Sequence, residues 1–521
     1  MITAGKKITF PLLVCLLVLL GCQATGSGAM RKAEKAKEPP SELPDTDKRR
    51  EVTRQALGKA YAHYVHGIFH DNTDHIQEAI RDYQKALRYD GQASAIYTRL
   101  GVDHLKLKHY NEAIEALKTA RSLDPEDERP RMLLALLYVT LNRFSDAAKE
   151  YELALARSPK DKKVLAALAD LYVLDGKLEE AIGIYQKLLE QEENGLIHFN
   201  LGILYSRLSK WKEATQQLER AIELEPRYVE SYMALGVLYE MQKDKSGAIR
   251  QYEKALLIDP LNPKLYLQLG RLYYDEHRTE EALRQLQTLL KLDPDHLEGT
   301  LELSYIYLKE GRSEEAIKIL EALSKHGRQR YELYLQLGLA QNALGKSEKA
   351  LEAYQKALAL DPDQAQTHYY LGALYERMGR KEEATKALKR SIELDPKDAD
   401  AYNYLGYMYA EQGINLEDAV ALVKKALEIN PDNGAYADSL GWAYFKQGKL
   451  EEAGREVERA IKLMGDDPIL HDHLGDIYFQ QGKVEEARSE WEKSLSLDPK
   501  QEAVREKLTQ KTPALSSDGR R

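Results

Sequence analysis

A small residue recurs along this chain at intervals of about 34 residues, from residue 67 to residue 475. The positions are Gly67, Gly101, Ala135, Ala169, Gly202, Gly236, Gly270, Ser304, Gly338, Gly372, Gly406, Gly441 and Gly475. A repeat of this length is typical of stacked helical hairpins, in which each unit packs only on its neighbours. The period therefore limits the fold to a helical array before any other feature is considered.

Other positions keep the same register. An alanine stands twelve residues after most of the small residues, a tyrosine stands three residues after most of them, and proline closes many units. The repeat around Gly236 shows all three, with Tyr239, Ala248 and Pro260. We expect the small residue and the alanine where two helices touch, and the tyrosine between hairpins. Proline should end the second helix, because it cannot continue one.

This pattern resembles the tetratricopeptide repeat, or TPR, and the resemblance covers roughly residues 54–499. It implies an all-α TPR solenoid, a right-handed superhelix of about 13 helical hairpins over residues 51–499. A charged segment after Pro499 predicts a C-terminal capping helix over residues 500–510. Residues 511–521 are expected to form a disordered tail.

The N-terminus carries a second signal. Lys6 and Lys7 precede an apolar run over residues 8–20, which is too short for a typical membrane-spanning helix. The run ends at Gly21 and Cys22, and this segment resembles a bacterial lipobox. The resemblance implies a lipoprotein signal peptide over residues 1–21 and lipid on Cys22. An ordinary signal peptide or anchor that happens to contain a cysteine is the alternative.

Residues 22–50 are polar and predict a flexible tether behind the lipidated cysteine. Gln23 follows the cysteine, and lipoproteins of this kind without aspartate there resemble those sorted to the outer membrane. We therefore expect an outer-membrane protein that faces the periplasm. Cys15 would leave with the signal peptide, so the mature chain would have no free thiol for a disulfide, a zinc knuckle or nucleophilic catalysis.

Charge and motifs exclude other classes. The net charge of −9 becomes about −11 without Lys6 and Lys7, which argues against nucleic acid as a partner. Gly345-Lys346-Ser347 resembles the end of a phosphate-binding loop, but Ala340 stands where that loop requires glycine. No other catalytic motif was found. The sequence predicts a protein that is not an enzyme and that has no cofactor, no catalytic residues and no resident metal.

Histidines cluster near the start of the array. His63, His66 and His70 are three and four residues apart on one expected helix, with His75 just beyond. This spacing places three imidazoles on one helix face, where they could hold a metal ion. The alternative interpretation is packing, because later repeats place ordinary core residues in the same slots, as at Tyr232, Leu235 and Tyr239. The packing interpretation is the stronger one on sequence grounds.

In the TPR family, one face of each first helix lines a concave groove. In the last three complete repeats this face combines aromatic side chains with carboxylates. The residues predicted to bind a partner there are Asn403, Tyr407, Asp438, Trp442, Phe445, Asp472 and Asp476. Exposed aromatics beside carboxylates favour an extended peptide that carries Lys or Arg next to an apolar anchor. A saccharide is the second candidate. The structural alternative is that Trp442 and Phe445 pack against the capping region while the acids face water.

The expected function is a protein–protein interaction scaffold or adaptor. The chain resembles bacterial TPR lipoproteins that serve pilus, secretion, exopolysaccharide-export or outer-membrane assembly systems. Its partners would be other envelope proteins, and its only membrane contact would be the lipid anchor. Two alternatives stay open at this stage: a regulatory or substrate-delivering subunit of an envelope enzyme, and a periplasmic metal- or small-ligand-binding protein.

The lipobox leads to the first prediction. Cys22→Ser should block lipidation and leave uncleaved precursor, whereas the wild-type protein should pellet with membranes because several acyl chains hold it firmly. Fractionation and the mass of the N-terminal peptide measure this outcome. Identical fractionation of both proteins, with no lipid mass on the peptide, would contradict the lipoprotein interpretation.

Overall fold

The computed structural model describes residues 44–325, 327 and 329–511. These residues form 27 helices and contain no strand, which confirms the all-α class. The predicted signal peptide, the lipidated Cys22 and most of the tether lie outside the described residues, as does the tail from residue 512. No described helix is both long and apolar enough to cross a membrane.

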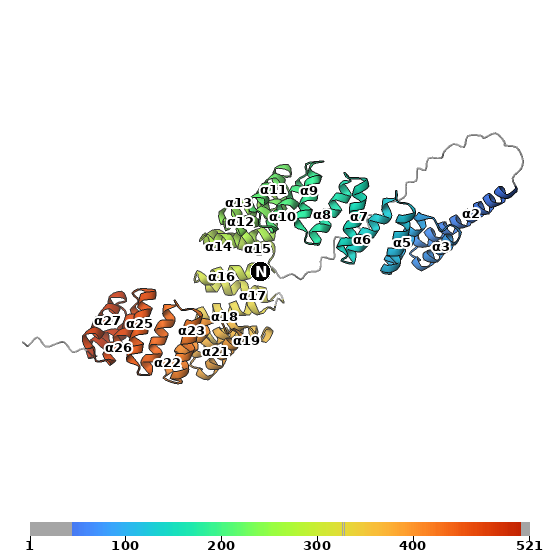
Figure 1. Ribbon diagram of the computed structural model, residues 1–521. Helices are drawn as coiled ribbons and strands as arrows, with labels where there is room; N and C mark the ends of the chain where they lie inside the picture. The colour runs from blue at the N-terminus through green and yellow to red at the C-terminus, as the bar shows by residue number, and fades with distance from the viewer. Residues whose placement is uncertain (1–43, 326, 328, 512–521) are drawn as a thin grey trace, which may run out of the picture. The chain divides into compact units, whose positions relative to one another are not determined.

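The chain divides between Lys177 and Leu178 into two compact units. Most of their helices are labelled in Figure 1. The first unit contains three hairpins followed by α8. Its helices are α2 (Pro44–Asn72), α3 (Ile76–Tyr89), α4 (Ser94–Lys106), α5 (Tyr110–Leu123), α6 (Glu128–Thr140), α7 (Phe144–Arg157) and α8 (Lys162–Leu174). By sequence, α8 is the first helix of the fourth repeat, and the second helix of that repeat opens the next unit.

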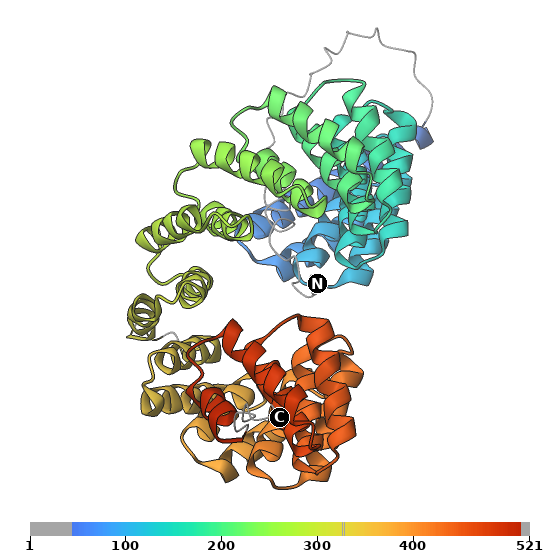
Figure 2. The same cartoon turned by 90° about the vertical axis from the view of Figure 1, so that its left-hand side faces the viewer.

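The second unit begins with α9 and continues through nine hairpins to α28. Its helices are α9 (Leu178–Leu189), α10 (Gly195–Arg207), α11 (Trp211–Leu224), α12 (Val229–Met241), α13 (Lys245–Ile258), α14 (Pro263–Asp275), α15 (Thr279–Leu292), α16 (Leu297–Lys309), α17 (Ser313–Lys325), α18 (Tyr331–Ala343), α19 (Ser347–Leu360), α20 (Ala365–Arg377), α21 (Lys381–Leu394), α22 (Ala399–Gln412), α23 (Leu416–Ile429), α24 (Gly434–Lys446), α25 (Leu450–Met464), α26 (Pro468–Gln480), α27 (Val484–Leu497) and α28 (Glu502–Lys511). The helices coloured orange to red stack side by side in chain order (Figure 2).

The recurring small residue lies where the two helices of a hairpin meet. Gly236 on α12 faces Tyr252 on α13, and a Cβ atom at Gly236 would lie 2.5 Å from Cε1 of that ring. Tyr252 and Ala248 are both fully buried. Each glycine of the series likewise lies against a side chain of the following helix, which confirms the predicted close contact at these positions.

The tyrosines fill the space between hairpins, as the register predicts. Tyr273 on α14 is buried, and its hydroxyl donates to Glu253 on α13 of the preceding repeat at 2.6 Å. The Arg278 guanidinium lies 4.4 Å from the centre of the same ring. Tyr273 therefore joins α14 to α13 through a hydrogen bond and to the turn before α15 through a cation–π contact.

The turn inside each repeat places a residue in the left-handed region. Glycine occupies this position in the later repeats, for example Gly379 with φ of 75°, whereas most of the earlier repeats use other residues, such as Ser209 with φ of 57°. Ala419 lies 13 residues after Gly406, one more than the usual 12, so this repeat has one extra residue near Gly413. The turn accommodates it with a second left-handed residue, Asn415.

The two ends of the array differ in whether another helix covers the terminal hairpin. At the C-terminus, Val504 of α28 is buried in a cluster with Trp491, and Leu508 packs against the same cluster. At the N-terminus, Phe69 on α2 is 60% exposed. The equivalent position is buried in every other repeat: Asp103, Leu137, Leu171, Leu204, Leu238, Leu272, Ile306, Ala340, Leu374, Met408, Ala443 and Ile477. The face of α2 that carries Phe69 therefore has no packing neighbour among the described residues, and we call it the open end of the array.

The Gly236–Tyr252 contact generates a stability prediction. Gly236→Leu should force Tyr252 out of a fully buried position and lower the free energy of unfolding by at least about 1–3 kcal/mol. Thermal melts followed by circular dichroism measure the effect. Gly183→Ala controls for loss of a glycine alone, because Gly183 lies on the helix α9 with no atom within 4 Å of an added Cβ. A Gly236→Leu melt that matches the wild type would contradict the assigned helix contact.

Candidate partner-binding face at the end of the array

The predicted site residues lie on the first helices of three successive hairpins, α22, α24 and α26. Each helix begins at an Asp or Asn side chain that accepts hydrogen bonds from backbone N–H groups of its first turn: Asp398, Asn433 and Asp467. The three helices also contact one another in sequence, α22 with α24 and α24 with α26. Side chains one repeat apart are therefore close enough to interact along this face, which we call the inner face.

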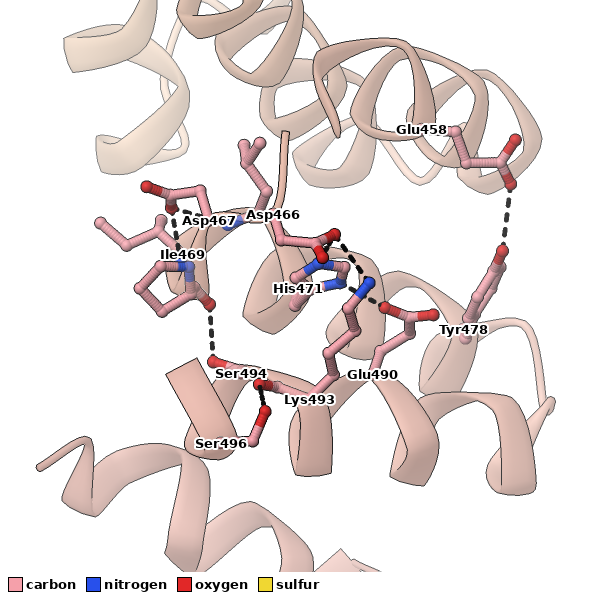
Figure 3. A network of polar contacts seen from close by, with 12 residues as sticks. Glu458, Asp466, Asp467, Ile469, His471, Tyr478, Glu490, Lys493, Ser494 and Ser496 are labelled. Atoms are coloured by element: carbon pink, nitrogen blue, oxygen red, sulfur yellow. Dashed lines mark hydrogen bonds and ion pairs between the residues drawn. The ribbon is translucent and has the colours of Figure 1, made fainter. Parts of the chain in front are cut away.

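A polar network fixes α26 against α27 (Figure 3). The buried His471 ring lies between two carboxylates, with Nδ1 2.6 Å from Glu490 and Nε2 3.2 Å from Asp466. Lys493 also binds Asp466, at 2.7 Å, and the Ser494 hydroxyl donates to the Pro468 carbonyl oxygen at 2.6 Å. These contacts orient α26 and thus the inner-face aspartates that it carries.

Trp442 is the centre of the inner face. Its ring stacks on His473 of α26 with 4.4 Å between ring centres, and on Phe445 at 5.0 Å. Its Nε1–H donates to the Glu411 carboxylate of α22 at 2.7 Å, and the Lys446 ammonium lies 4.7 Å from the ring centre. Trp442 therefore links α22, α24 and α26, and it is only partly open to solvent.

The three predicted aspartates already have partners inside the chain. Asp438 accepts a hydrogen bond from His473 Nδ1 at 2.9 Å. Asp472 and Asp476 both bind the Lys507 ammonium of α28, at 2.6 and 2.8 Å. The acids therefore do not merely face water. Both pairings use residues one repeat further along the chain.

The aromatic residues differ in how they pack. Phe445 packs against the buried cluster that contains Val457, Leu474 and Ile477. The cluster beneath α28 contains Phe479 and includes neither Trp442 nor Phe445. The expectation that Trp442 and Phe445 pack against the capping region is therefore wrong, because α28 covers the following repeat instead.

The open part of the inner face lies around Tyr407 on α22. Tyr407 is 39% exposed, and partial burial together with the charges of Glu411 and Asp438 raises its pKa. Glu376 and Glu411 are exposed, and neither has a cationic partner within the part of the chain that the structure describes. The Asn403 Oδ1 atom is buried without a hydrogen-bond partner among the described residues. This region combines an available aromatic ring with unpaired negative charge.

Sequence reasoning missed four residues that shape this face: Glu376, Glu411, His473 and Lys507. A detectable signal exists for Glu411, His473 and Lys507, because each lies 31 or 35 residues from its partner, about one repeat minus three residues or plus one. A search for complementary polar residues at these separations would have found the pairs.

Comparisons with known proteins agree with the fold. Tetratricopeptide repeat models match residues 74–137, 132–195, 199–263 and 468–501. The model of the cilia and flagella-associated protein 70 C-terminal domain matches residues 240–468. A search of curated proteins gave no match. The chain is a tetratricopeptide repeat protein, and its fold is suited to protein–protein interaction.

The chain also matches solved structures, including the following three. The APC/C hetero-tetramer Cut9-Hcn1 is 16% identical over 88% of this chain and 98% of the other, with a TM-score of 0.42. Yeast Tom70 is 17% identical over 86% of this chain and 94% of the other, with a TM-score of 0.35. MamA is 30% identical over 31% of this chain and 95% of the other, with a TM-score of 0.29.

His473 makes the inner face sensitive to pH. Burial lowers the pKa of His473, but its hydrogen bond to Asp438 and the charges of Asp438, Asp472 and Asp476 outweigh burial and raise the pKa above its usual value. A group whose pKa is raised by folding stabilises the protein fully below its unfolded pKa and loses that contribution as pH rises through the folded pKa.

We therefore expect α24 and α26 to open more readily as pH rises from about 6.5, the usual pKa of histidine, through the raised pKa of His473. Hydrogen exchange of peptides from these helices, corrected for the intrinsic pH dependence of exchange, measures the effect. His473→Gln should remove the pH dependence in this range. If exchange in the His473→Gln variant depends on pH as strongly as in the wild type, the attribution of this effect to His473 is wrong.

Proposed function

We propose that this chain is a non-catalytic TPR scaffold that binds other proteins of a bacterial envelope through its inner face. Lipid on Cys22 would anchor it to the outer membrane, where it faces the periplasm. The systems that fit this role are assembly or export machines of the pilus, secretion, exopolysaccharide or outer-membrane type. The TPR fold supports the scaffold role, and the lipobox resemblance supports the anchor.

One observation carries the choice of binding face. The Asp472 and Asp476 carboxylates together hold the Lys507 ammonium, so the inner face already binds a lysine side chain within the chain. The same chemistry continues toward α22, where Glu376 and Glu411 flank the exposed Tyr407 and have no cationic partner among the described residues. A partner would place Lys or Arg near these carboxylates and an apolar side chain on Tyr407.

The proposed ligand is an extended peptide segment with a basic residue beside an apolar anchor. Electrostatic attraction would make its association rate fall as ionic strength increases. A saccharide would also stack on an exposed tyrosine, but its binding would depend little on salt. The salt dependence therefore separates the two ligand classes.

The experiment begins with a photo-cross-linking amino acid at position 407 in the native host and identification of the attached protein by mass spectrometry. Affinity is then measured for the purified partner segment. Tyr407→Ala should weaken binding at least about tenfold if the ring is an anchor. Glu411→Gln should mainly slow association and reduce the salt dependence.

Tyr305→Ala is the matched control. Tyr305 follows the small residue Ser304 as Tyr407 follows Gly406, and it is 43% exposed. The control should leave affinity unchanged, because Tyr305 lies on a middle repeat away from α22. An equal loss of affinity in both variants, or no loss of affinity in Tyr407→Ala, would contradict the proposed binding face.

A further inference from the structure

The first hairpin brings imidazole groups and a carboxylate together. His66 and His70 lie one turn apart on α2, and Asp82 on α3 lies opposite them. His66 Nδ1 is 2.8 Å from Asp82 Oδ2, and His70 Nε2 is 3.7 Å from the same oxygen. The three ligand atoms all lie within 4.8 Å of one another. Two elements of the fold thus place three metal-ligating groups around one point.

This cluster is more than ordinary packing. The position of His66 holds a buried leucine in most other repeats, for example Leu235, whereas the His66 side chain is 64% exposed at the open end of the array. Asp82 is the buried member, with a side chain only 8% exposed.

The two Asp82 oxygens have separate surroundings. Oδ2 faces His66 and His70, whereas Oδ1 binds the Lys85 ammonium at 3.0 Å and lies 3.9 Å from His63 Nδ1. One oxygen is therefore directed at the two imidazoles while the other is oriented by a cation. A hydrogen-bonded carboxylate of this kind is typical of metal sites, in which outer contacts fix the ligand.

We propose that His66, His70 and Asp82 bind a divalent transition-metal ion, with Zn²⁺ the best match. Two imidazole nitrogens and one carboxylate oxygen are a preferred zinc donor set, and water would occupy the fourth position on the exposed side of His66. Ligand atoms of a tetrahedral zinc site are about 3.4 Å apart, as follows from metal–ligand distances of about 2.0–2.1 Å. The His66–Asp82 and His70–Asp82 distances of 2.8 and 3.7 Å lie on either side of this value, and all three ligand atoms lie within 4.8 Å of one another. Metal binding would therefore require the two imidazole rings to rotate toward the ion.

The site has a structural consequence that does not depend on the partner face. A metal bound by these residues joins α2 to α3 at the end of the array, where the outer face of α2 has no packing neighbour among the described residues. Metal binding to the folded state alone stabilises that state in proportion to affinity. The bound ion would therefore stabilise the hairpin most exposed to fraying.

The test uses the full chain, purified without a histidine tag and freed of metal by a chelator. Zn²⁺ binding is measured by titration calorimetry, and Co²⁺ is added as a probe because a tetrahedral site gives it intense visible absorption. We expect about one ion per chain, with a Kd in the micromolar range or lower. His66→Gln, His70→Gln and Asp82→Asn should each weaken Zn²⁺ binding at least about tenfold.

The double variant His104→Gln/His109→Gln is the matched control, because it removes another adjacent histidine pair in the same unit, with ring centres 5.8 Å apart. Its Zn²⁺ affinity should equal that of the wild type. His66→Gln keeps the test valid if Asp82→Asn disturbs folding, since the His66 ring is largely exposed. Zn²⁺ affinity that His66→Gln and His70→Gln leave unchanged, or absence of binding at high micromolar Zn²⁺, would overturn the proposal.

Discussion

The structure depends on one contact that is repeated along the chain: a small residue on the first helix of a hairpin against a large buried side chain on the second. Gly236 faces Tyr252, and Gly475 faces Trp491, each 16 residues further on. Neither large residue would fit if the small position carried a longer side chain. Because this contact fixes how the helices of a hairpin pack, it also fixes which side chains each first helix presents to the next repeat.

The inner face follows from that regular spacing. Residues separated by one repeat meet in pairs, as Trp442 meets Glu411 and Asp438 meets His473. Both pairs stabilise the stack, and Asp438, like Asp472 and Asp476, also has its charge paired inside the chain. The face is thus divided into a part whose carboxylates are paired internally near α26 and α28, and a part around Tyr407 whose carboxylates have no cationic partner among the described residues. Only the second part is available without rearrangement of the chain.

Much of the fold could be predicted from the sequence, because the period places equivalent residues in equivalent environments. The contact at Gly236, the buried Tyr273 and the cap after Pro499 all follow from register and helix geometry. The division of the chain after Lys177 could not be predicted in this way, since no change in composition and no linker marks it.

The site was harder to predict than the fold. Sequence position placed the predicted residues on the first helices of their hairpins, but it did not identify the partners of their side chains. Lys507 belongs to the capping helix, and its ion pairs with Asp472 and Asp476 were not predicted. Likewise, Asp82 could not be connected to the histidines of α2, because the approach of two helices decides which of their side chains meet. Periodicity predicts environment, whereas pairing between helices requires coordinates.

Hydrogen exchange of the full chain with and without its cross-linked partner tests the central claim most directly. Amide protection reports local opening, so a bound segment should slow exchange where it lies. The account predicts new protection concentrated in α22 and α24, with little change in α12 and α14. Protection confined to the middle repeats or to the first unit, with none in α22 and α24, would contradict it.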